Sequence, residues 1–419
     1  MNKLCICILT YNRPEAISEV LEKELVFLNR YSTELGIFDS SESMETELIV
    51  EKYMNQGYKN LFYQKCDLGI YTSASKKIYL IYEEMMKKSY DYIWMIHDHT
   101  TFNETAFKYI FDQLGANGDF YFLEMRASRF SVNRILELND FLPKAALSLA
   151  RLGTAIVRRE SFLEGTDWKH MSQKYLREEN CGYCHVGYYF ERMSELKNPR
   201  IIQLEFPREC FVDFKRYEKL GWHSASVRIC LGHWGNTLMA LPEQYTSKMT
   251  ALQTQDKWLL SKYKLLEYKK SGNYRISDFL KYRKWIRLIM PENFCNAFWV
   301  AVLPYKTAVN KYFAKLLNEI EKQRKAGNKI CLYGAGKDGF ECFTFLSELD
   351  VKVDSFLVTK TEGNPKQLGG CPVNRADEYL KNNSAFVIIA ILPKGVPEVK
   401  TYLDSLAAKG ADLSYMEFA

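Results

Sequence analysis

Short apolar runs alternate with helix-like segments over the first hundred residues, and this alternation constrains the fold more than any other feature. The run Leu4–Thr10 has the mixed branching of a buried strand, and Pro14–Phe27 opens like a helix, with proline in its first turn. Further strands are expected at 34–38, 60–64 and 92–96, and helices at 45–56 and 72–88. Strands separated by helices predict an α/β fold whose mostly parallel sheet is covered on both faces, with ligands at the carboxyl ends of the strands.

A polar loop follows each of the expected strands. The loops read TYNR from Thr10, DSSES from Asp39, CDLGIYTSASKK from Cys66 and HDH from His97. The ring of Tyr11 could hold a base, and Asp39 could accept a hydrogen bond from an N–H group of the uracil type. The third loop offers a glycine turn, hydroxyl groups and, close to a helix start, Lys76 or Lys77. The ordered series of loops favours a nucleotide site.

The order of these motifs resembles the nucleotide-sugar-dependent glycosyltransferases of the GT-A fold, especially the large inverting family that builds bacterial polysaccharides. In that family the first strand ends in a T-[YF]-N-R type turn and the second in an Asp-containing turn that reads the base. A later Asp-x-Asp motif binds a divalent metal on the donor diphosphate. The resemblance covers residues 3–110 and weakens toward residue 245. It implies a Rossmann-like GT-A domain that binds a UDP-sugar through Thr10, Tyr11, Arg13, Asp39, Ser40, Gly69, His97 and Asp98.

The metal motif departs from the family pattern, because His97–His99 reads His-Asp-His where Asp-x-Asp is usual. Carboxylates suit Mg²⁺ and Mn²⁺, whereas imidazole shifts the preference toward Mn²⁺ and other transition metals. The resemblance implies Asp98 and His99 as metal ligands. It also implies a later histidine as a further ligand or a contact to the diphosphate, with His233 as the candidate and His223 as a weaker one. The alternatives are an ordinary polar turn at the strand end, or a site that uses no metal.

An inverting transfer needs a general base to deprotonate the acceptor hydroxyl while cations stabilise the leaving diphosphate. In the resembled family this base follows the metal motif, near the start of a helix. Here that region reads YLREENCGYCHVGYYFERM. Glu179 is the first candidate and Glu178 the second, with Glu191 and Asp167 nearby. For each of these acids, a solvated helix end is the alternative interpretation.

The same region contains a C-x-x-C-H match at 181–185, the pattern of c-type haem attachment. Haem attachment needs export, and the sequence shows no export signal. A redox pair normally lies between a first strand and helix, and a zinc site needs further ligands at suitable spacing. We therefore expect none of these three functions here.

A basic and aromatic segment fills the second region, 251–325. From Lys257 to Arg287 it carries ten Lys or Arg against two acids, interleaved with Trp, Tyr and Phe. Such a segment suits peripheral association with an anionic membrane surface, or a nucleic-acid groove. The alternative is a helical linker whose aromatic residues point inward and whose lysines are solvated.

The third region, 326–419, opens with KICLYGAGKDGF, in which a strand leads into Gly334, Gly336 and Gly339 and then a helix. This G-x-G-x-x-G setting predicts a Rossmann-like domain whose turn can approach a diphosphate. Asp354 is expected near the end of the following strand, where an acid would meet a ribose hydroxyl. The region resembles the small Rossmann-like domains appended to polysaccharide-biosynthesis enzymes. A domain that binds nothing is the alternative.

The whole chain has 419 residues, which predicts two or three domains, divided here as 1–250, 251–325 and 326–419. Its net charge of +6 does not argue for nucleic acid, and its 11 scattered cysteines suit reduced thiols. Without a secretory signal or an apolar spanning segment, we expect a cytoplasmic protein, at the inner face of the plasma membrane if its acceptor is lipid-linked.

These features predict a glycosyltransferase that moves a sugar from a nucleoside-diphosphate sugar to a hydroxyl of a glycan or lipid-linked acceptor, by inverting displacement, in surface polysaccharide or glycoconjugate synthesis. The expected cofactor is Mn²⁺ or Mg²⁺, and a homo-oligomer is compatible with the sequence. Two alternatives stay open. One is a non-catalytic nucleotide-sugar-binding scaffold or sensor, and the other is a nucleotidyltransferase.

Overall fold

The computed structural model describes residues 3–31, 33–66, 70–207, 210–213, 225–255, 260–391 and 395–418. Its contacts divide the chain into two compact units. Unit 1 comprises Met1–Leu259 and Ser271–Cys295, and unit 2 comprises Leu260–Lys270 and Asn296–Ala419. The basic and aromatic segment 251–325 contributes helices to both units. The division of the chain into three regions stays a prediction.

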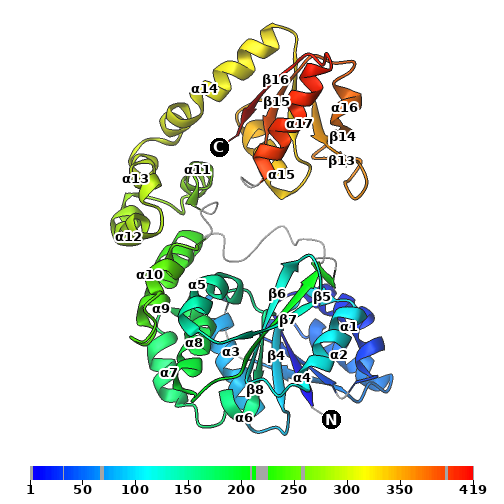
Figure 1. The fold of residues 1–419 in the computed structure, drawn as a ribbon, viewed down its shortest axis with the longest axis vertical. Helices are drawn as coiled ribbons and strands as arrows, with labels where there is room; N and C mark the ends of the chain where they lie inside the picture. The colour runs from blue at the N-terminus through cyan, green and yellow to red at the C-terminus, as the bar shows by residue number, and fades with distance from the viewer. Residues whose placement is uncertain are drawn as a thin grey trace. The chain divides into compact units, whose positions relative to one another are not determined.

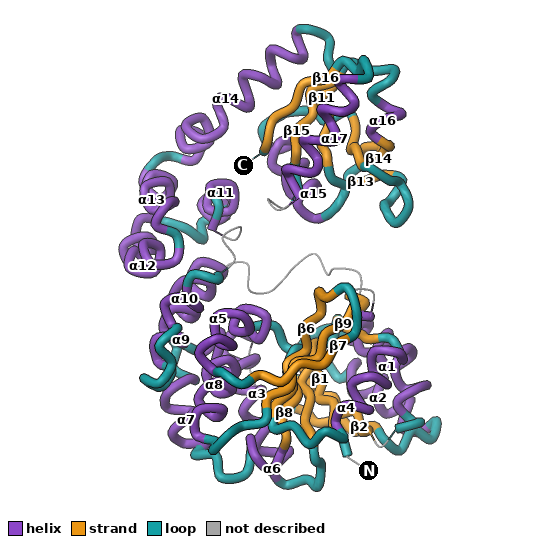
Figure 2. Tube along the Cα trace, viewed as in Figure 1, coloured by secondary structure: helices purple, strands orange, loops and turns teal. Residues whose placement is uncertain are grey.

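Unit 1 is built on an eight-stranded sheet in the order β3-β2-β1-β4-β8-β6-β9-β7 (Figures 1 and 2). In the first half, each strand is parallel to its neighbours: β1 (Leu4–Thr10), β2 (Thr33–Asp39), β3 (Leu61–Lys65) and β4 (Tyr92–His97). The second half is mixed, because β8 runs antiparallel to β4 and β6, and β7 runs antiparallel to β9. These strands are β6 (Phe120–Ala127), β7 (Ser131–Ile135), β8 (Ala155–Arg158) and β9 (Ile201–Pro207). A separate ribbon pairs β5 (Thr100–Phe102) with β10 (Phe211–Asp213).

Helices cover both faces of this sheet, with α1, α2 and α4 on one face and α3, α5 and α8 on the other (Figure 1). Those on the first face are α1 (Pro14–Leu28), α2 (Glu45–Asn55) and α4 (Glu104–Leu114). On the second side lie α3 (Ile70–Met86), α5 (Leu138–Leu149), α7 (Trp168–Tyr175) and α8 (Cys184–Glu195). Shorter elements are α6 (Arg159–Phe162), η1 (Cys181–Tyr183), η4 (Arg228–His233), α9 (Trp234–Ala240), α10 (Lys248–Leu252) and η6 (Pro291–Asn293), and α12 (Ile276–Ile289) completes the unit.

Strand β1 shows why this sheet lies inside the unit. All seven of its residues are buried, as expected for a strand with helices on both faces. Because successive side chains point to opposite faces, Leu4, Ile6 and Ile8 enter one core cluster together with Ile17 and Val20 of α1. Burial of this kind fixes the strand, and with it the position of the polar loop at its carboxyl end.

The predicted α/β fold, a large mostly parallel sheet plus a second, smaller α/β sheet, is confirmed. The strands and helices expected between residues 4 and 97 are all present, with bounds that differ by no more than two residues. The antiparallel strands β7 and β8 were not predicted. Among the described helices, none combines the length and the apolar character needed to cross a membrane.

Unit 2 contains a six-stranded sheet in the order β13-β14-β12-β11-β15-β16 (Figure 2). Its strands are β11 (Lys329–Tyr333), β12 (Ser355–Val358), β13 (Gln367–Leu368), β14 (Cys371–Arg375), β15 (Ala385–Ile389) and β16 (Leu413–Glu417). Its helices are α11 (Lys262–Lys270), α13 (Phe294–Val302, whose first two residues belong to unit 1), α14 (Tyr305–Lys325), α15 (Lys337–Glu348), α16 (Ala376–Tyr379) and α17 (Val396–Ala408). The predicted strand–turn–helix at the glycine motif is confirmed as β11, the turn and α15.

The expected position of Asp354 is wrong. This residue precedes β12 rather than following it, and its Oδ2 atom accepts a hydrogen bond from the N–H of Ile330, 2.8 Å away. Ile330 lies at the start of β11, whereas the glycine turn follows the end of that strand. Since β11 and β12 are parallel, Asp354 lies at the edge of the sheet opposite the turn. It cannot meet a ribose held at the turn, and it instead ties two strand starts together.

The aromatic residues of α12 point inward, as the linker interpretation of this segment expects. Tyr282 and Trp285 are buried, and their rings lie against the backbone of η4 and α9 at two glycines. A Cβ atom added at Gly232 would lie 2.7 Å from the Tyr282 ring, and one at Gly235 would lie 2.4 Å from the Trp285 ring. The two glycines therefore allow the close approach that holds α12 on unit 1.

Candidate functional site

The candidate site lies where the strand order of unit 1 reverses. From β1 the chain moves to β2 and β3 on one side, and it returns to β4 on the other side of β1. Open α/β sheets bind ligands outside the carboxyl ends of the strands at such a switch point. Here Thr10, the last residue of β1, donates a hydrogen bond from Oγ1 to Oδ2 of Asp98, directly after β4, over 2.9 Å.

Asp98 is a buried carboxylate that three side chains contact. Besides Thr10, Nη1 of Arg13 lies 3.1 Å from its Oδ1 atom, and Nδ1 of His99 lies 3.2 Å from the same oxygen. Although burial raises the pKa of Asp98, the hydrogen bond with His99 and the Arg13 guanidinium outweigh it and hold this pKa below its usual value. Asp98 is therefore an anion at neutral pH, neutralised by Arg13.

Lys77 brings a second cation into the same cluster. Its Nζ atom donates to the carbonyl oxygen of Thr10 over 2.7 Å and to Oγ of Ser40 over 2.6 Å. The side chain is 3% exposed, and burial lowers its pKa, although Asp39 and Asp98 act in the opposite direction. The sequence left Lys76 and Lys77 as alternatives. Lys76 is exposed, so the fold of α3 brings Lys77 alone into the site.

Asp39 is the last residue of β2 and pairs with Thr10, and Ser40 follows it. Asp39 is fully buried, its Oδ1 accepts from the backbone N–H of Ser41 over 2.7 Å, and its Oδ2 accepts from the hydroxyl of Tyr63 over 3.0 Å. The Lys65 ammonium lies 3.9 Å from Oδ2. In this arrangement Asp39 fixes the turn after β2, and contact with a base stays a prediction. Sequence reasoning missed Tyr63 and Lys65, which the alternation of β3 places on the face of Asp39.

The loops after β1 and β2 are joined through Asn12. Its backbone N–H donates to Oγ of Ser41 over 2.7 Å, and its side-chain oxygen accepts from the N–H of Glu42 over 3.1 Å. Asn12 has a positive φ of 49°, a conformation that asparagine adopts more readily than most residues. Tyr11 is half-buried beside this turn, and burial and the Glu42 carboxylate raise its pKa. The predicted donor contact at Gly69 lies outside the described residues.

The predicted metal ligands are not gathered into one site among the described residues. No three described His, Cys, Asp or Glu side chains lie close enough to share a metal ion. Oδ1 of Asp98 already contacts Arg13, so a divalent cation at that oxygen would have to displace the guanidinium. His97 stacks on His99 at 4.9 Å between ring centroids, and burial lowers the pKa of His97 to about 3.

His233 lies in a contact of its own. Its Nδ1 atom accepts a hydrogen bond from the backbone N–H of Gly182 over 3.0 Å, and the side chain is 3% exposed. A neutral imidazole has one lone pair in the ring plane, and this contact uses it. The arrangement does not fit metal coordination through Nε2. The weaker candidate, His223, lies outside the described residues.

The acid candidates Glu178 and Glu179 lie on an exposed turn between α7 and η1. Nη1 of Arg228 is 3.9 Å from Oε1 of Glu178, and the backbone oxygen of Glu179 accepts from the side chain of Asn236 over 3.1 Å. The start of α8 contacts the start of α3, where Sγ of Cys184 lies 3.9 Å from the carbonyl oxygen of Ser75. The turn therefore lies toward the end of α3 that carries Lys77.

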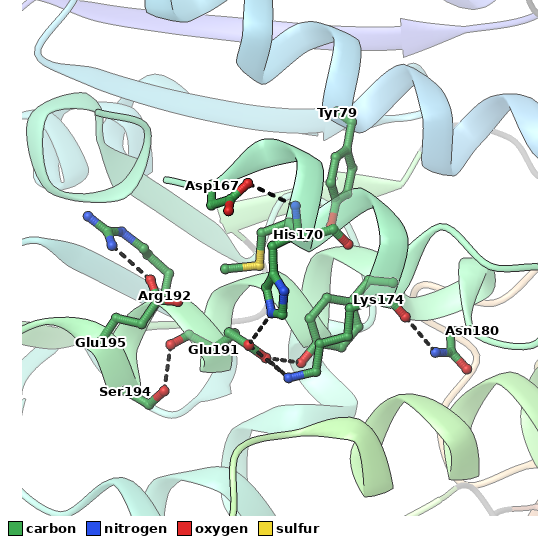
Figure 3. Close-up of polar contacts among 11 residues, drawn as sticks. Tyr79, Asp167, His170, Lys174, Asn180, Glu191, Arg192, Ser194 and Glu195 are labelled. Carbon is green, nitrogen blue, oxygen red and sulfur yellow. Dashed lines mark hydrogen bonds and ion pairs between the residues drawn. The ribbon is translucent and has the colours of Figure 1, made fainter. Parts of the chain in front are cut away.

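Two further acids have structural partners (Figure 3). Glu191 is buried on α8, with Nζ of Lys174 at 2.7 Å from Oε1, Nε2 of His170 at 3.3 Å, and the Tyr175 hydroxyl as a further donor. Asp167 caps α7, because its Oδ1 accepts from the backbone N–H of His170 over 2.9 Å. Glu191 joins α8 to α7, and Asp167 caps the start of α7. Because both carboxylates are held in these structural contacts, neither is placed like a general base.

The C-x-x-C-H segment is used in packing. Cys184 is buried, and Nε2 of the buried His185 lies 3.2 Å from the carbonyl oxygen of Ala150. The side chain of Cys181 lies outside the described residues. All described cysteine side chains are free thiols.

No known protein-family profile matches the chain, and no curated protein sequence matches it. Solved structures do resemble it at a distance. S. aureus TarS, residues 1–349, in complex with UDP is 14% identical with a TM-score of 0.42, and the match covers 78% of this chain and 92% of that one. The mannosyltransferase PcManGT from Pyrobaculum calidifontis, with GDP-Man and Mn²⁺, is 13% identical with a TM-score of 0.38, covering 74% and 87%. Glucosyl-3-phosphoglycerate synthase from Mycobacterium tuberculosis is 11% identical with a TM-score of 0.38, covering 58% and 81%.

Proposed function

We propose that the chain is a glycosyltransferase that uses a nucleoside-diphosphate sugar, specifically a UDP-sugar. One observation carries the proposal: Thr10, Arg13, Lys77 and Asp98 meet at the switch point of the sheet. Arg13 and Lys77 supply two buried or half-buried cations at the carboxyl ends of the strands. Open α/β sheets bind nucleotides at this edge. The acceptor is a hydroxyl of a glycan or lipid-linked carrier in surface polysaccharide or glycoconjugate synthesis.

The proposed reaction is a single displacement with inversion. The acceptor oxygen bonds to the anomeric carbon as the bond from that carbon to the diphosphate oxygen breaks, and the acceptor proton passes to a carboxylate. Glu179 is the proposed base, because the carboxylate of Glu178 is directed to Arg228 at 3.9 Å. Arg13 and Lys77 supply the positive charge that stabilises the leaving diphosphate.

A divalent ion would supply further positive charge on the diphosphate, and Asp98 and His99 are the residues predicted to hold it. Their present contacts do not fit a metal, because Arg13 lies on Asp98 and no third ligand is near among the described side chains. The proposed step is therefore assigned to Arg13 and Lys77.

A non-catalytic nucleotide-sugar-binding scaffold is the second candidate. It is favoured by the contacts of Asp98, whose two oxygens are engaged by Thr10, Arg13 and His99. A scaffold would bind the donor without turning it over. The Gly334, Gly336 and Gly339 turn of unit 2 is proposed as a second nucleotide-binding place, on the strength of its strand–turn–helix setting.

The exposed face of α12 supports association with an anionic membrane. Leu280 is 51% exposed, and Arg283, Lys284 and Arg287 are exposed along the same side of the helix. Each basic residue near such a surface contributes about 1 kcal/mol. Sedimentation with vesicles that contain phosphatidylserine should recover the full chain, and neutral phosphatidylcholine vesicles should not. Equal recovery with both would contradict this association.

The transferase proposal is tested with the full chain and a panel of UDP-, GDP- and dTDP-sugars, each with and without Mn²⁺. A donor should raise the melting temperature and be hydrolysed slowly or transferred. Binding without turnover would identify the scaffold. If no donor shifts the melting temperature and none is hydrolysed, the proposed function is wrong.

A further inference from the structure

Strand β7 forms an open edge of the sheet in unit 1. In the described part of the chain it pairs with β9 alone and stands last in the strand order. Alternate residues of such a strand point their N–H and C=O groups away from the sheet, where they can pair with another strand. Side chains hold β7 on β9, because Glu205 accepts hydrogen bonds from the Ser131 hydroxyl over 2.5 Å and from the Asn133 amide over 3.2 Å. The edge is therefore a formed strand with one unpaired side.

Apolar side chains are exposed along this edge. Phe130, directly before the strand, is 37% exposed, Val132 is 47% exposed, and Leu136, directly after the strand, is 76% exposed. The Phe130 ring contacts Phe206, and Val132 pairs with Leu204, so both lie on the face of the sheet that α4 covers. Leu136 continues the same alternation. Single exposed apolar residues are common on proteins, but three on one side of an unpaired edge mark a docking surface.

A second copy of β7 fits this edge in an antiparallel register. Opposite residues of two paired strands share a face of the sheet, so a two-fold axis perpendicular to the sheet passes between two copies of one residue. With the axis at Asn133, Phe130 lies opposite Leu136 of the second copy, and Val132 lies opposite Arg134. The exposed apolar side chains of the two copies then cover one another.

The charged residues favour the same register. With the axis at Asn133, Arg129 lies opposite Glu137 of the second copy, and the symmetry repeats this pair. Both side chains are exposed, and neither forms an ion pair with a side chain that the structure describes. Opposite charges on directly facing residues stabilise a pair of strands. Apolar contacts and charge therefore agree on one register.

Shifting the axis by one residue loses this match. An axis at Arg134 sets two like charges directly against each other, which destabilises the pairing. An axis at Val132 leaves the exposed Leu136 opposite Ser128. The register centred on Asn133 is therefore better specified than its neighbours.

We propose that two copies of the chain associate through β7, edge to edge and antiparallel, with Asn133 at the two-fold axis. The partner is a second copy because the apolar and charged side chains of the edge complement themselves in this register. The pairing joins the two sheets into one continuous sheet and closes the open edge of each. Because the interface is isologous, association stops at the dimer. The inference goes beyond the proposed function and does not depend on it.

Sedimentation velocity of the full chain at about 1 to 100 µM tests the pairing, and a dimer should form as the concentration rises. Arg129→Glu and Glu137→Arg each set like charges against each other twice, so each should weaken association about tenfold. Val132→Lys, opposite Arg134, should weaken it to a similar extent. Lys144→Glu reverses an exposed charge on α5, outside the paired residues, and is the matched control that should leave association unchanged.

Mixing the two charge-reversed variants tests the register itself. In a mixture of Arg129→Glu and Glu137→Arg chains, each of the two charge pairs again joins opposite charges. The mixture should therefore associate about as tightly as the unmodified chain, although each variant alone does not. An interface elsewhere on the molecule gives no reason for this rescue.

The inference is overturned by a chain that stays monomeric over the whole range, by variants that associate like the unmodified chain, or by a mixture that shows no rescue. A monomeric chain would leave the edge to a strand of another protein. The substituted residues are exposed, so melting temperatures measured at low concentration should match that of the unmodified chain. If one variant melts early, the other two still decide, because each disrupts the pairing by itself.

Discussion

The two units reverse their strand order in the same way and use the switch point differently. In unit 1 the reversal lies between β1 and β4, where Thr10 bonds Asp98 and charged side chains gather. In unit 2 it lies between β11 and β15, where Gly334 approaches so closely that an added Cβ would lie 2.9 Å from the carbonyl oxygen of Ala390. Charged side chains line the switch point of unit 1, whereas close backbone contacts form the switch point of unit 2. With similar topology, the residues at the strand ends therefore determine the chemistry.

The largest expected effect is on turnover at the charged edge. Lys77→Met removes the buried ammonium and keeps most of the stem, so the leaving diphosphate loses a preorganised cation. Sugar transfer should fall about 10²- to 10³-fold, the usual loss for one such electrostatic contact. Lys76→Met is the matched control, because Lys76 is the exposed neighbour on the same helix. Equal rates for the two variants would show that Lys77 has no part in the reaction.

In the glycine turn of unit 2, substitutions are expected to lower stability. A Cβ atom at Gly339 would lie 1.8 Å from the carbonyl oxygen of Gly334, so Gly339→Ala must shift the turn. The free energy of unfolding of unit 2 should fall by about 3 kcal/mol, as for severe overpacking. At Gly336 no atom lies within 4 Å of an added Cβ. Gly336→Ala should therefore lower the free energy of unfolding by much less, about 1 kcal/mol. Denaturant unfolding followed in the full chain measures both.

Donor binding sharpens this comparison. If the charge in unit 1 makes the transferase site, Gly339→Ala should leave the donor KM of sugar transfer within about twofold, since the glycine turn, proposed as a separate nucleotide-binding place, belongs to the other unit. A tenfold rise of this KM in Gly339→Ala would instead place the catalytic donor at the glycine turn.

A third prediction concerns pH at the charged edge. The folded-state pKa of Asp98 is lowered, so its charge contributes stability above the usual aspartate pKa of 3.8, and this contribution is lost as pH falls through the folded pKa. Asp98→Asn should lower the free energy of unfolding by about 1–3 kcal/mol at pH 7, and the difference should shrink below about pH 4. Melting curves from pH 3 to pH 7 measure it. A difference that stays constant over this range would show that the carboxylate charge does not stabilise the fold.

Local pattern was sufficient to predict the elements around the charged edge. Strands β1 and β4 are buried almost throughout, so their apolar runs end abruptly where polar residues begin. That boundary places Thr10 and Asp98 correctly at strand ends. Asp354 was misplaced because its strand has only four residues, and the apolar residues before it blurred where the strand starts. Strand ends are predictable where burial is uniform and less so where strands are short.

The remaining contacts depend on residues far apart in sequence. The choice of Lys77 over Lys76 follows from the side of α3 that faces β1 and β2, and the Gly182–His233 bond spans 51 residues. The π-helical geometry of η4 leaves no local signal in a stretch that includes two buried apolar residues, Cys230 and Leu231. Tertiary packing decides such contacts, so periodicity in one sequence does not predict them.

The smallest expected effect returns to unit 2, where a neutral pair joins the ends of β11 and β12, on the side of β11 away from the switch point. The hydroxyls of Tyr333 and Thr359 lie 2.6 Å apart, at the ends of β11 and β12. Thr359→Val should lower the free energy of unfolding by about 1 kcal/mol, as for one neutral hydrogen bond. Neither hydroxyl titrates between pH 3 and 7, so this loss should be the same across that range.

Thr361→Val, at an exposed position in the same loop, is the control and should change stability by no more than about 0.5 kcal/mol. A loss for Thr359→Val that follows pH as Asp98→Asn does would mean that the edge of unit 2 also depends on charge, and the contrast between the two edges would fail.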